Sequence, residues 1–443
     1  MRKTKLSTLL SVALMSSATS ASDLLQAYRD ALVYDSQFSS AKLQRDAGRE
    51  RQVQGRSALL PQAGFNASVA KVDGTGSSTS ATTGLQTPFK LDYTDQKYVL
   101  QLKQPLYNLA SFIAYDQSKL QVAASEVQFE QSRIDLALRV AQAYFDMLAA
   151  QDAIAFIQAQ KTAIAEQLAS AKRNFEVGTA TITDTHEAQA RFDLAQAQEI
   201  AALNDLEVKR NQLALLTGHT PEVLRGLAPG VKLSAPEPSA VEQWVTNAEA
   251  GNIGVVAQGL AAEIAKLDIR RASAGHLPTV DAIASYTDSK SAFLSSPFSS
   301  TVTNVGVQLN IPIFSGYATS SQVTQAVALE QKARADLDTA RRSAAQGART
   351  AYLGVQSGLS QVNALEAAER SSLLALDANK LGYEVGVRIN IDVLNAQQQL
   401  YSTRRDLAKA RYDTLVASLK LKAASGTLSE ADLEAINALL EAR

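Results

Sequence analysis

Residues 383–392 read YEVGVRINID, and residues 175–184, which lie 208 positions earlier, read FEVGTATITD. Each stretch begins with an aromatic residue, continues with Glu-Val-Gly, and ends on an aspartate after five variable residues. Glycine permits the left-handed backbone that a sharp reversal needs. Both stretches follow long segments without proline, so the motif predicts the tip of a helical hairpin, written twice in one chain.

The rest of the chain shows the same duplication. Matched residues recur in both halves: Tyr144 with Tyr352, Pro61 with Pro278, and Pro105 with Pro312. A proline-rich stretch, residues 221–238, separates the halves, because proline interrupts both helices and central strands. We therefore expect a first structural repeat over residues 22–230, a second over residues 231–426, and a C-terminal helix over residues 427–443.

Each repeat contains a segment suited to a very long helix. Residues 110–175 and 317–382 contain no proline, and a helix of that length extends roughly 100 Å. In the first segment, apolar residues recur at every seventh position from Ala143 to Ala171, which is coiled-coil spacing. The hairpin tips then lead into return helices expected at residues 181–217 and 389–425.

Two pairs of strands precede these helices. In TNVGVQLNIPIF, residues 303–314 without a break in alternation, Val305, Val307 and Leu309 point one way while polar residues point the other. Strands are expected at roughly residues 62–72, 93–105, 279–288 and 301–312. About ten alternating residues is the length of a tilted strand that crosses a bilayer. The predicted fold class is mainly α with a small β part.

The first residues predict export from the cytoplasm. Arg2, Lys3 and Lys5 precede an apolar run from Leu6 to Met15, and small residues follow up to Ala21. This order is typical of a secretory signal peptide, which we place at residues 1–21. No later stretch approaches the ~20 consecutive apolar residues of a membrane-spanning helix.

Composition excludes several classes of protein. The formal net charge is −1, which does not favour a nucleic-acid binder, and the absence of cysteine excludes disulfides and thiol catalysis. His186, His219 and His276 are isolated, and no phosphate-binding glycine loop occurs. We therefore expect no enzyme activity, no cofactor and no metal site.

The predicted strands constrain assembly. A sheet of four strands has two open edges, and an open edge in hydrocarbon leaves backbone groups unsatisfied at several kcal/mol each. One chain therefore cannot insert alone. Two chains would form an eight-stranded barrel that side chains fill, whereas three would form a twelve-stranded barrel with an open lumen.

Taken together, these features resemble the TolC family of outer-membrane channel proteins. The resemblance covers the mature chain and is most specific in YEVGVRINIDVLNAQQQL, residues 383–400, and KLKAASGTLSEADLEAINALL, residues 420–440. It implies a homotrimer with an outer-membrane barrel in contact with lipid, and a helical tunnel in the periplasm. It also implies two partners, a periplasmic adaptor (membrane fusion) protein and an inner-membrane transporter, either ABC-type or proton-driven.

The resemblance also implies roles for residues at the two tips. Asp184, Tyr383, Arg388 and Asp392 would form the periplasmic gate, with Arg388 paired to Asp184 and Tyr383 as a hydrogen-bonding latch. Three copies of Asp392 would form an acidic ring that favours cations and permits cation block. Asn395 stands where many members have a second aspartate, so a second ring is absent or displaced. The exposed turns, Val177, Gly178 and Thr179 with Val385, Gly386 and Val387, would bind the adaptor.

Simpler roles remain open for the same residues. Asp184 and Asp392 lie near the start of the return helices, where aspartate is a good helix cap. Tyr383 and Phe175 can pack the turn, and Arg388 can be a solvated charge.

The sequence therefore predicts an export channel, with type I protein secretion as the first function and multidrug efflux as the alternative. A periplasmic coiled-coil adaptor or structural protein is the alternative of a different class. Such a protein would lack two hairpins combined with strands of bilayer width, so the repeat argues against it.

Overall fold

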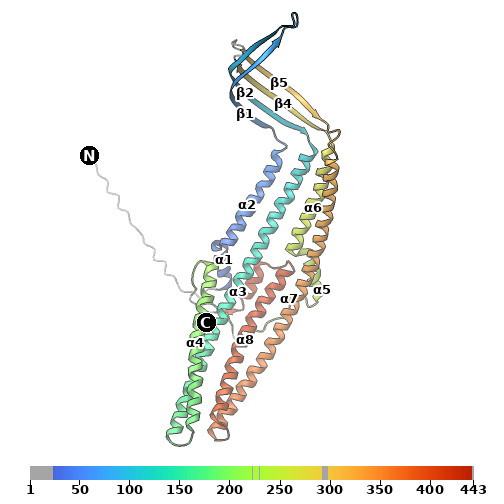
Figure 1. Ribbon diagram of the computed structural model, residues 1–443. Coiled ribbons are helices and arrows are strands. Elements are labelled where there is room, and N and C mark those ends of the chain that lie inside the picture. Colours follow the sequence, from blue (N-terminus) through green and yellow to red (C-terminus); the bar gives the residue numbers. More distant parts are fainter. Residues whose placement is uncertain (1–22, 222, 229, 292–297, 442–443) are drawn as a thin grey trace, which may run out of the picture.

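The computed structural model describes residues 23–221, 223–228, 230–291 and 298–441. The predicted signal peptide, residues 1–21, lies outside the described residues. Figure 1 shows the sheet at one end of the molecule, helix pairs through the middle, and two helical hairpin tips at the other end. Both tips therefore lie far from the sheet.

The two repeats have the same order of elements. The first contains α1 (Leu24–Tyr34), α2 (Ser36–Ser57), β1 (Gln62–Thr79), β2 (Gln86–Tyr107), α3 (Leu109–Glu176) and α4 (Ile182–Thr217). The second contains α5 (Val241–Gly251), α6 (Ile253–Ser273), the 3-10 turn η1 (Ala274–His276), β4 (Thr279–Ser291), β5 (Phe298–Asn310), α7 (Ala318–Glu384) and α8 (Asn390–Ala424). The short strand β3 (Gly226–Leu227) lies between the repeats, and α9 (Glu430–Asn437) and β6 (Leu440–Glu441) follow them.

A polar cap divides the first helical segment of each repeat. The Asp35 carboxylate accepts a hydrogen bond from the Phe38 amide at 2.6 Å and starts α2. Asn252 accepts one from the Gly254 amide at 2.9 Å and starts α6. A short side-chain acceptor at the N-cap satisfies an amide that has no partner inside the helix, so both breaks are encoded locally.

The long helices of the two repeats are nearly equal, with 68 residues in α3 and 67 in α7. The expected seam is buried at Ala150, Ile164 and Ala171, while Phe175 at the tip is 44% exposed. Lys161, which interrupts the apolar series, donates a hydrogen bond to Glu199 on the return helix. That bond, followed by one from Gln158, lowers the pKa of Glu199.

The four long strands form one antiparallel sheet in the order β1-β2-β4-β5, with β1 and β5 at its edges. Strands β1 and β2 extend well beyond the expected residues 62–72 and 93–105, because the Gly, Ser and Thr residues between them continue the ladder up to the pair Thr79 and Gln86. Strand β5 ends at Asn310, before Pro312, which has no amide hydrogen to donate. Among the described residues, no helix has the length and apolar character needed to cross a membrane.

One face of the sheet is apolar. Register places Phe65 opposite Leu100, Leu100 opposite Tyr286, and Ala284 opposite Val305. Large side chains on this face remain exposed in the single chain, with Val305 82% exposed. On the other face, Lys103 and Asp281 form an ion pair at 2.9 Å. The alternation predicted from the sequence is therefore present across the sheet.

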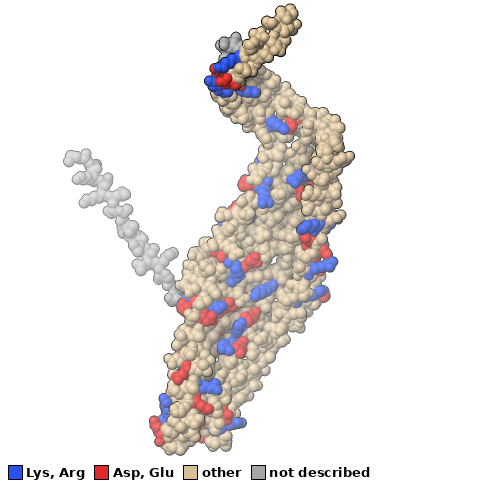
Figure 2. Space-filling model, viewed as in Figure 1, with Lys and Arg blue, Asp and Glu red and all other residues tan. Residues whose placement is uncertain are grey.

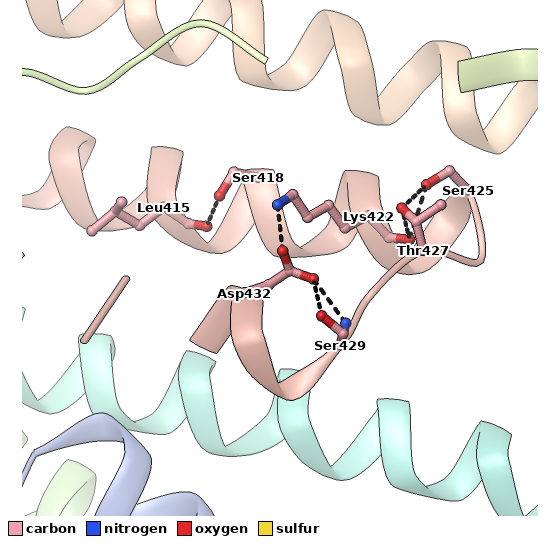
Figure 3. A network of polar contacts seen from close by, with 7 residues as sticks. All are labelled: Leu415, Ser418, Lys422, Ser425, Thr427, Ser429 and Asp432. Atoms are coloured by element: carbon pink, nitrogen blue, oxygen red, sulfur yellow. Dashed lines mark hydrogen bonds and ion pairs between the residues drawn. The ribbon is translucent and has the colours of Figure 1, made fainter. Parts of the chain in front are cut away.

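The largest apolar core lies midway along the helices, where α1, α3, α4, α8 and α9 meet. Figure 3 shows how the C-terminal segment joins it: the Lys422 ammonium donates to Asp432, which also accepts from the Ser429 hydroxyl and amide. Burial raises the pKa of Asp432, but these hydrogen bonds outweigh burial and lower it overall. The segment expected as a helix also ends in β6, which pairs with β3.

The linker between the repeats is bound to both long helices. Tyr144 on α3 donates its hydroxyl to the Arg225 carbonyl at 2.9 Å, and the repeat-equivalent Tyr352 on α7 donates to the Ser239 carbonyl at 2.5 Å. Trp244 packs against Val355 and Leu421, which confirms its expected place in the middle of the helical region. The duplicated tyrosines thus hold the connection between the two halves.

Candidate functional site at the hairpin tips

The two tips have the same backbone turn. Gly178 and Gly386 have φ angles of 79° and 78°, in the left-handed region that favours glycine. In the first tip the Thr179 amide donates to the Asn174 carbonyl at 2.8 Å, and in the second the Val387 amide donates to the Gly382 carbonyl at 2.9 Å. The predicted reversals are therefore identical at the level of the backbone.

The turns present apolar side chains to solvent. Val177, Val385 and Val387 are 73%, 64% and 76% exposed, and Gly178, Thr179 and Gly386 are exposed as well. Beyond these positions, Ile182 and Ile389 are also exposed. Each tip is thus an exposed apolar knob on a rigid turn, although its role as a binding surface for an adaptor stays a prediction.

The first tip is closed by a capping box. The Thr181 hydroxyl accepts a hydrogen bond from the Asp184 amide at 3.3 Å, and the Asp184 carboxylate accepts one from the Thr181 amide at 3.0 Å. This reciprocal pair satisfies two amides at the start of α4. The Asp184 carboxylate is therefore already bound within its own hairpin.

The second tip lacks that cap. Ile389 occupies the position equivalent to Thr181 and has no side-chain hydrogen bond to offer at the start of α8. Asp392 instead lies 3.7 Å from the Arg388 guanidinium, in an ion pair that is 59% and 33% exposed at the two side chains. The negative charge predicted for an Asp392 ring is thus partly compensated inside each chain.

Polar contacts join the two tips to each other. The Asn174 amide group donates to the Tyr383 hydroxyl at 3.2 Å. Asn390, which is only 1% exposed, accepts from Gln167 at 2.5 Å and donates to the Asp184 carbonyl at 3.1 Å. The second hairpin is therefore bonded to both helices of the first.

Arg191 on α4 makes the next contact above the tip. Its guanidinium donates to the Asn395 carbonyl oxygen at 2.9 Å and to the Gln398 carbonyl oxygen at 2.5 Å. An aspartate at position 395 would give this arginine a full ion pair. The neutral asparagine keeps the hydrogen bond and leaves the positive charge of Arg191 without a carboxylate partner at that position.

An apolar cluster supports the polar contacts. Ile164 and Leu168 on α3, Ala188 and Ala195 on α4, and Leu394 on α8 are buried together. Burial of apolar surface stabilises the contact between the hairpins, and the short alanines permit close approach of the helix backbones. The tips are therefore held by a small core as well as by hydrogen bonds.

The structure brings most of the predicted gate residues to one place. Tyr383 and Asn395 contact the first hairpin, and Arg388 and Asp392 contact each other. Among the ion pairs of the described residues, none joins Arg388 to Asp184 within one chain, because Thr181 and Arg388 itself supply nearer partners. A pair between these two residues across protomers stays a prediction.

Three residues of the junction were missed from the sequence: Asn174, Arg191 and Asn390. Asn390 is the first residue of α8, where asparagine is an ordinary helix-start residue and gives no sign of a long-range partner. For Arg191 one signal existed. An asparagine at position 395 in place of an expected aspartate suggests a changed partner on the facing helix.

Comparison with protein families gives one match. A family model described as "Outer membrane efflux protein" matches residues 27–219 and 244–427, which cover both repeats. The alkaline protease secretion protein AprF of Pseudomonas aeruginosa is 35% identical over 422 residues, which cover 94% of this chain and 86% of that protein. Outer membrane protein TolC of Vibrio cholerae is 33% identical over 435 residues, which cover 96% of each.

A solved structure shares the fold. The outer membrane protein VceC of Vibrio cholerae superimposes with a TM-score of 0.75, covering 91% of this chain and 96% of that one at 20% identity. The likeness therefore extends over the sheet, the helices and both tips.

Proposed function

This chain belongs to the outer membrane efflux protein family, and on that premise we propose that three copies assemble into a conduit from an inner-membrane transporter to the cell exterior. The family predicted from the duplicated motifs is confirmed, and the protein is an outer-membrane export channel. What the chain does in that channel can be argued from its exposed surfaces.

The observation that supports the trimer best is the pair of open sheet edges. Strands β1 and β5 each pair on one side only in the single chain. Unpaired backbone groups cost several kcal/mol each in hydrocarbon, so β1 of one copy must pair with β5 of the next. Three copies of a four-stranded sheet give twelve strands, the smallest such barrel that leaves an open lumen by our argument.

The helices offer a second surface for the same partner. On α4, Leu194, Ala201, Val208 and Leu215 recur at every seventh residue and are exposed. On α7, an exposed series with the same spacing contains Leu353, Ser360, Ala367, Leu374 and Leu381. Apolar residues at heptad spacing are typical of a coiled-coil seam.

The two stripes match in height above the tips. Leu194 lies 12 residues after the start of α4 at Ile182, and Leu374 lies 10 residues before the end of α7 at Glu384. Higher up, the same counts are 33 for Leu215 and 31 for Leu353. Helices α4 and α7 of neighbouring copies can therefore pack antiparallel over the same span, which favours a closed ring.

The tips are proposed as the gate of this conduit. The second hairpin is bonded to the first through Tyr383, Asn390 and Asn395, and opening requires that these contacts separate. A docking adaptor would supply the free energy by binding the exposed turns at Val177 and Val385. Three Asp392 carboxylates at the axis would attract cations, weakened by the Arg388 beside each of them.

We propose type I protein secretion as the process, with an ABC transporter and a periplasmic adaptor as partners. A relative of 35% identity is named as a secretion protein for alkaline protease. Drug efflux with a proton-driven transporter is the second candidate, favoured by the description of the family model. In both cases the chain acts as a passive conduit in contact with outer-membrane lipid, without catalysis, cofactor or nucleic acid.

Two experiments test the proposal. The first measures the mass of the detergent-extracted protein by light scattering, for wild type, Val208→Lys on the stripe, and Gln196→Lys on another face of α4 as the matched control. A trimer that Val208→Lys weakens and Gln196→Lys preserves supports the seam. A monomer in all three preparations would refute the assembly.

The second experiment decides the process. The chain is expressed in cells that lack their own outer-membrane export channel, together with either an ABC transporter, its adaptor and a protein substrate, or a proton-driven pump and its adaptor. Secretion of the protein substrate supports type I secretion. Drug resistance without protein secretion would instead assign the chain to efflux.

A further inference from the structure

The hairpin of β1 and β2 extends beyond the rest of the sheet. Strand β4 pairs with β2 only from Gln96, opposite Lys290, onwards. Residues 70–79 and 86–95 therefore pair with each other alone and form a two-stranded ribbon past the end of β4 and β5 (Figure 1). We call this segment the projecting ribbon.

The register shows a change in the polarity of its faces. Pairing runs without a shift from Gln62 and Lys103 to Thr79 and Gln86, so each face can be followed by counting every second residue. Near the helices, Phe65 and Leu100 lie on the apolar outer face, and Gln101 and Lys103 lie on the polar face with the lumen. This is the pattern of a strand between lipid and water.

In the projecting ribbon the pattern is reversed. The pairs Val72 with Tyr93, Gly74 with Leu91, and Gly76 with Phe89 all fall in the series that contains Gln101 and Lys103. The opposite series contains Lys71 and Asp92, which form an ion pair at 3.5 Å, together with Asp73 and Lys90. The apolar stripe thus begins on the lumen side, directly above the lipid-facing band.

Side-chain packing shows that the stripe is built rather than accidental. The Phe89 ring lies across Gly76, where an added Cβ would come within 2.6 Å of the ring, and Leu91 lies over Gly74. Val72, Leu91 and Tyr93 are only partly buried in one chain. Figure 2 shows the ribbon as an uncharged arm with the charged side chains gathered at its base, and residues 74–89 contain no charged residue.

We propose that the apolar stripes of three copies pack against one another above the barrel and narrow its outer mouth. This inference rests on the proposed trimer, because closing the barrel places the lumen side of each ribbon towards the same axis. Lipid is not the partner there, since the charged series occupies the outer side. A second and third copy of the same stripe are the apolar surfaces that symmetry brings to that place.

Single cysteines test the contact, because the natural chain contains none. Full-length Leu91→Cys and Asp92→Cys proteins, on opposite faces of the same strand, are treated in outer membranes with a flexible bifunctional maleimide. Leu91→Cys is expected to give one linked pair and one free chain per trimer, whereas Asp92→Cys stays unlinked. Mass measurement in detergent then reports whether each variant is a trimer.

The outcomes separate the two proposals. Trimers in which Asp92→Cys links and Leu91→Cys does not would overturn the inference and leave the channel intact. Trimers in which neither residue links, and Cys at position 91 is also shielded from a hydrophilic maleimide, would place the stripe against lipid or its own chain and overturn it too. Absence of trimers for the wild type would refute the proposed function itself.

A functional readout sharpens the test. Phe89→Ser with Leu91→Ser removes the stripe, and Lys90→Ser with Asp92→Ser alters the opposite face as the matched control. Stripe removal is expected to raise the entry of a large hydrophilic antibiotic into cells that hold the periplasmic end open by mutation. Equal entry for stripe and control variants would contradict a constriction at the outer mouth.

Discussion

The two hairpin tips have one backbone turn and two different ways of fixing it. In the first tip, Thr181 and Asp184 satisfy each other within a few residues. In the second, Ile389 cannot cap, and Asp392 pairs with Arg388 instead. One substitution, three residues before a shared aspartate, has therefore changed the role of that aspartate from a helix cap to an ion-pair partner.

The difference teaches where each tip obtains its stability. The first hairpin is closed by local hydrogen bonds that remain if its neighbour moves away. The second depends on long-range contacts through Tyr383, Asn390 and Asn395 with the first. Of the two, the second hairpin is the one whose free energy changes most when the tips separate, which suits it to be the moving part of a gate.

The largest effect is expected from Asn390→Leu. This change removes two hydrogen bonds and leaves Gln167 and the Asp184 carbonyl without them, at about 1–3 kcal/mol for each unsatisfied group. Amide exchange near the start of α8 should accelerate at least roughly tenfold, since about 1.4 kcal/mol corresponds to that factor. Asn379→Leu, an exposed asparagine bonded to its own helix, is the control, and equal exchange in both variants would disprove the long-range role.

The next effect concerns the closed state. Tyr383→Phe with Arg388→Ser removes the bond to Asn174 and the ion pair to Asp392. We expect higher conductance in planar bilayers and altered block by divalent cations, because Asp392 loses its compensating charge. Asp392→Ala should weaken that block. Unchanged conductance of the double variant would show that the tip is closed by other contacts.

A smaller effect tests the divergence of the tips directly. Ile389→Thr gives the second tip the residue that caps the first, and the new hydroxyl can complete a capping box with Asp392. An N-cap side chain stabilises a helix by about 0.5–2 kcal/mol, so exchange at the start of α8 should slow. The reverse change, Thr181→Ile, should accelerate exchange at the start of α4. If neither changes, the cap does not explain the difference.

The smallest effect depends on pH and compares the helix breaks of the two repeats. Burial raises the pKa of Asp35, but hydrogen bonds from Arg139 and the Phe38 amide outweigh it, so that its pKa lies below the ordinary value. The unfolded chain then binds the proton more readily, and stability is lost as pH falls below about 4. Asn252 in the second repeat cannot titrate.

Thermal unfolding measured from neutral to acid pH checks this prediction. The melting temperature of Asp35→Asn should fall less steeply in acid than that of wild type, at the cost of lower stability at neutral pH. Parallel curves for the two proteins would mean that Asp35 contributes nothing to the pH dependence.

Much of the fold followed from the sequence because repeats, prolines and periodicity are local signals. The Glu-Val-Gly motif predicted both turns, and strict alternation predicted the two faces of the sheet. The full length of β1 and β2 did not follow, since the Gly, Ser and Thr residues of the projecting ribbon are typical of loops. Only the pairing of the two strands shows that they continue the ladder.

The site was predictable in its position and less so in its partners. Tyr383 and Asn395 were selected from a resemblance, but their bonds to Asn174 and Arg191 depend on how two helices approach, which no local pattern gives. The partner of Asp392 was predictable in hindsight. Threonine three residues before Asp184 and isoleucine three residues before Asp392 are visible in the sequence and decide which aspartate can cap.

The central claim is that the two hairpins of one chain must separate for export. Gln167→Cys with Asn390→Cys, two positions joined by a hydrogen bond in the closed tip, allows them to be linked with a bifunctional maleimide that has a reducible spacer. In cells with a matching transporter and adaptor, secretion should stop when the hairpins are linked and resume after reduction. Secretion that continues at the same rate through linked hairpins would contradict the account.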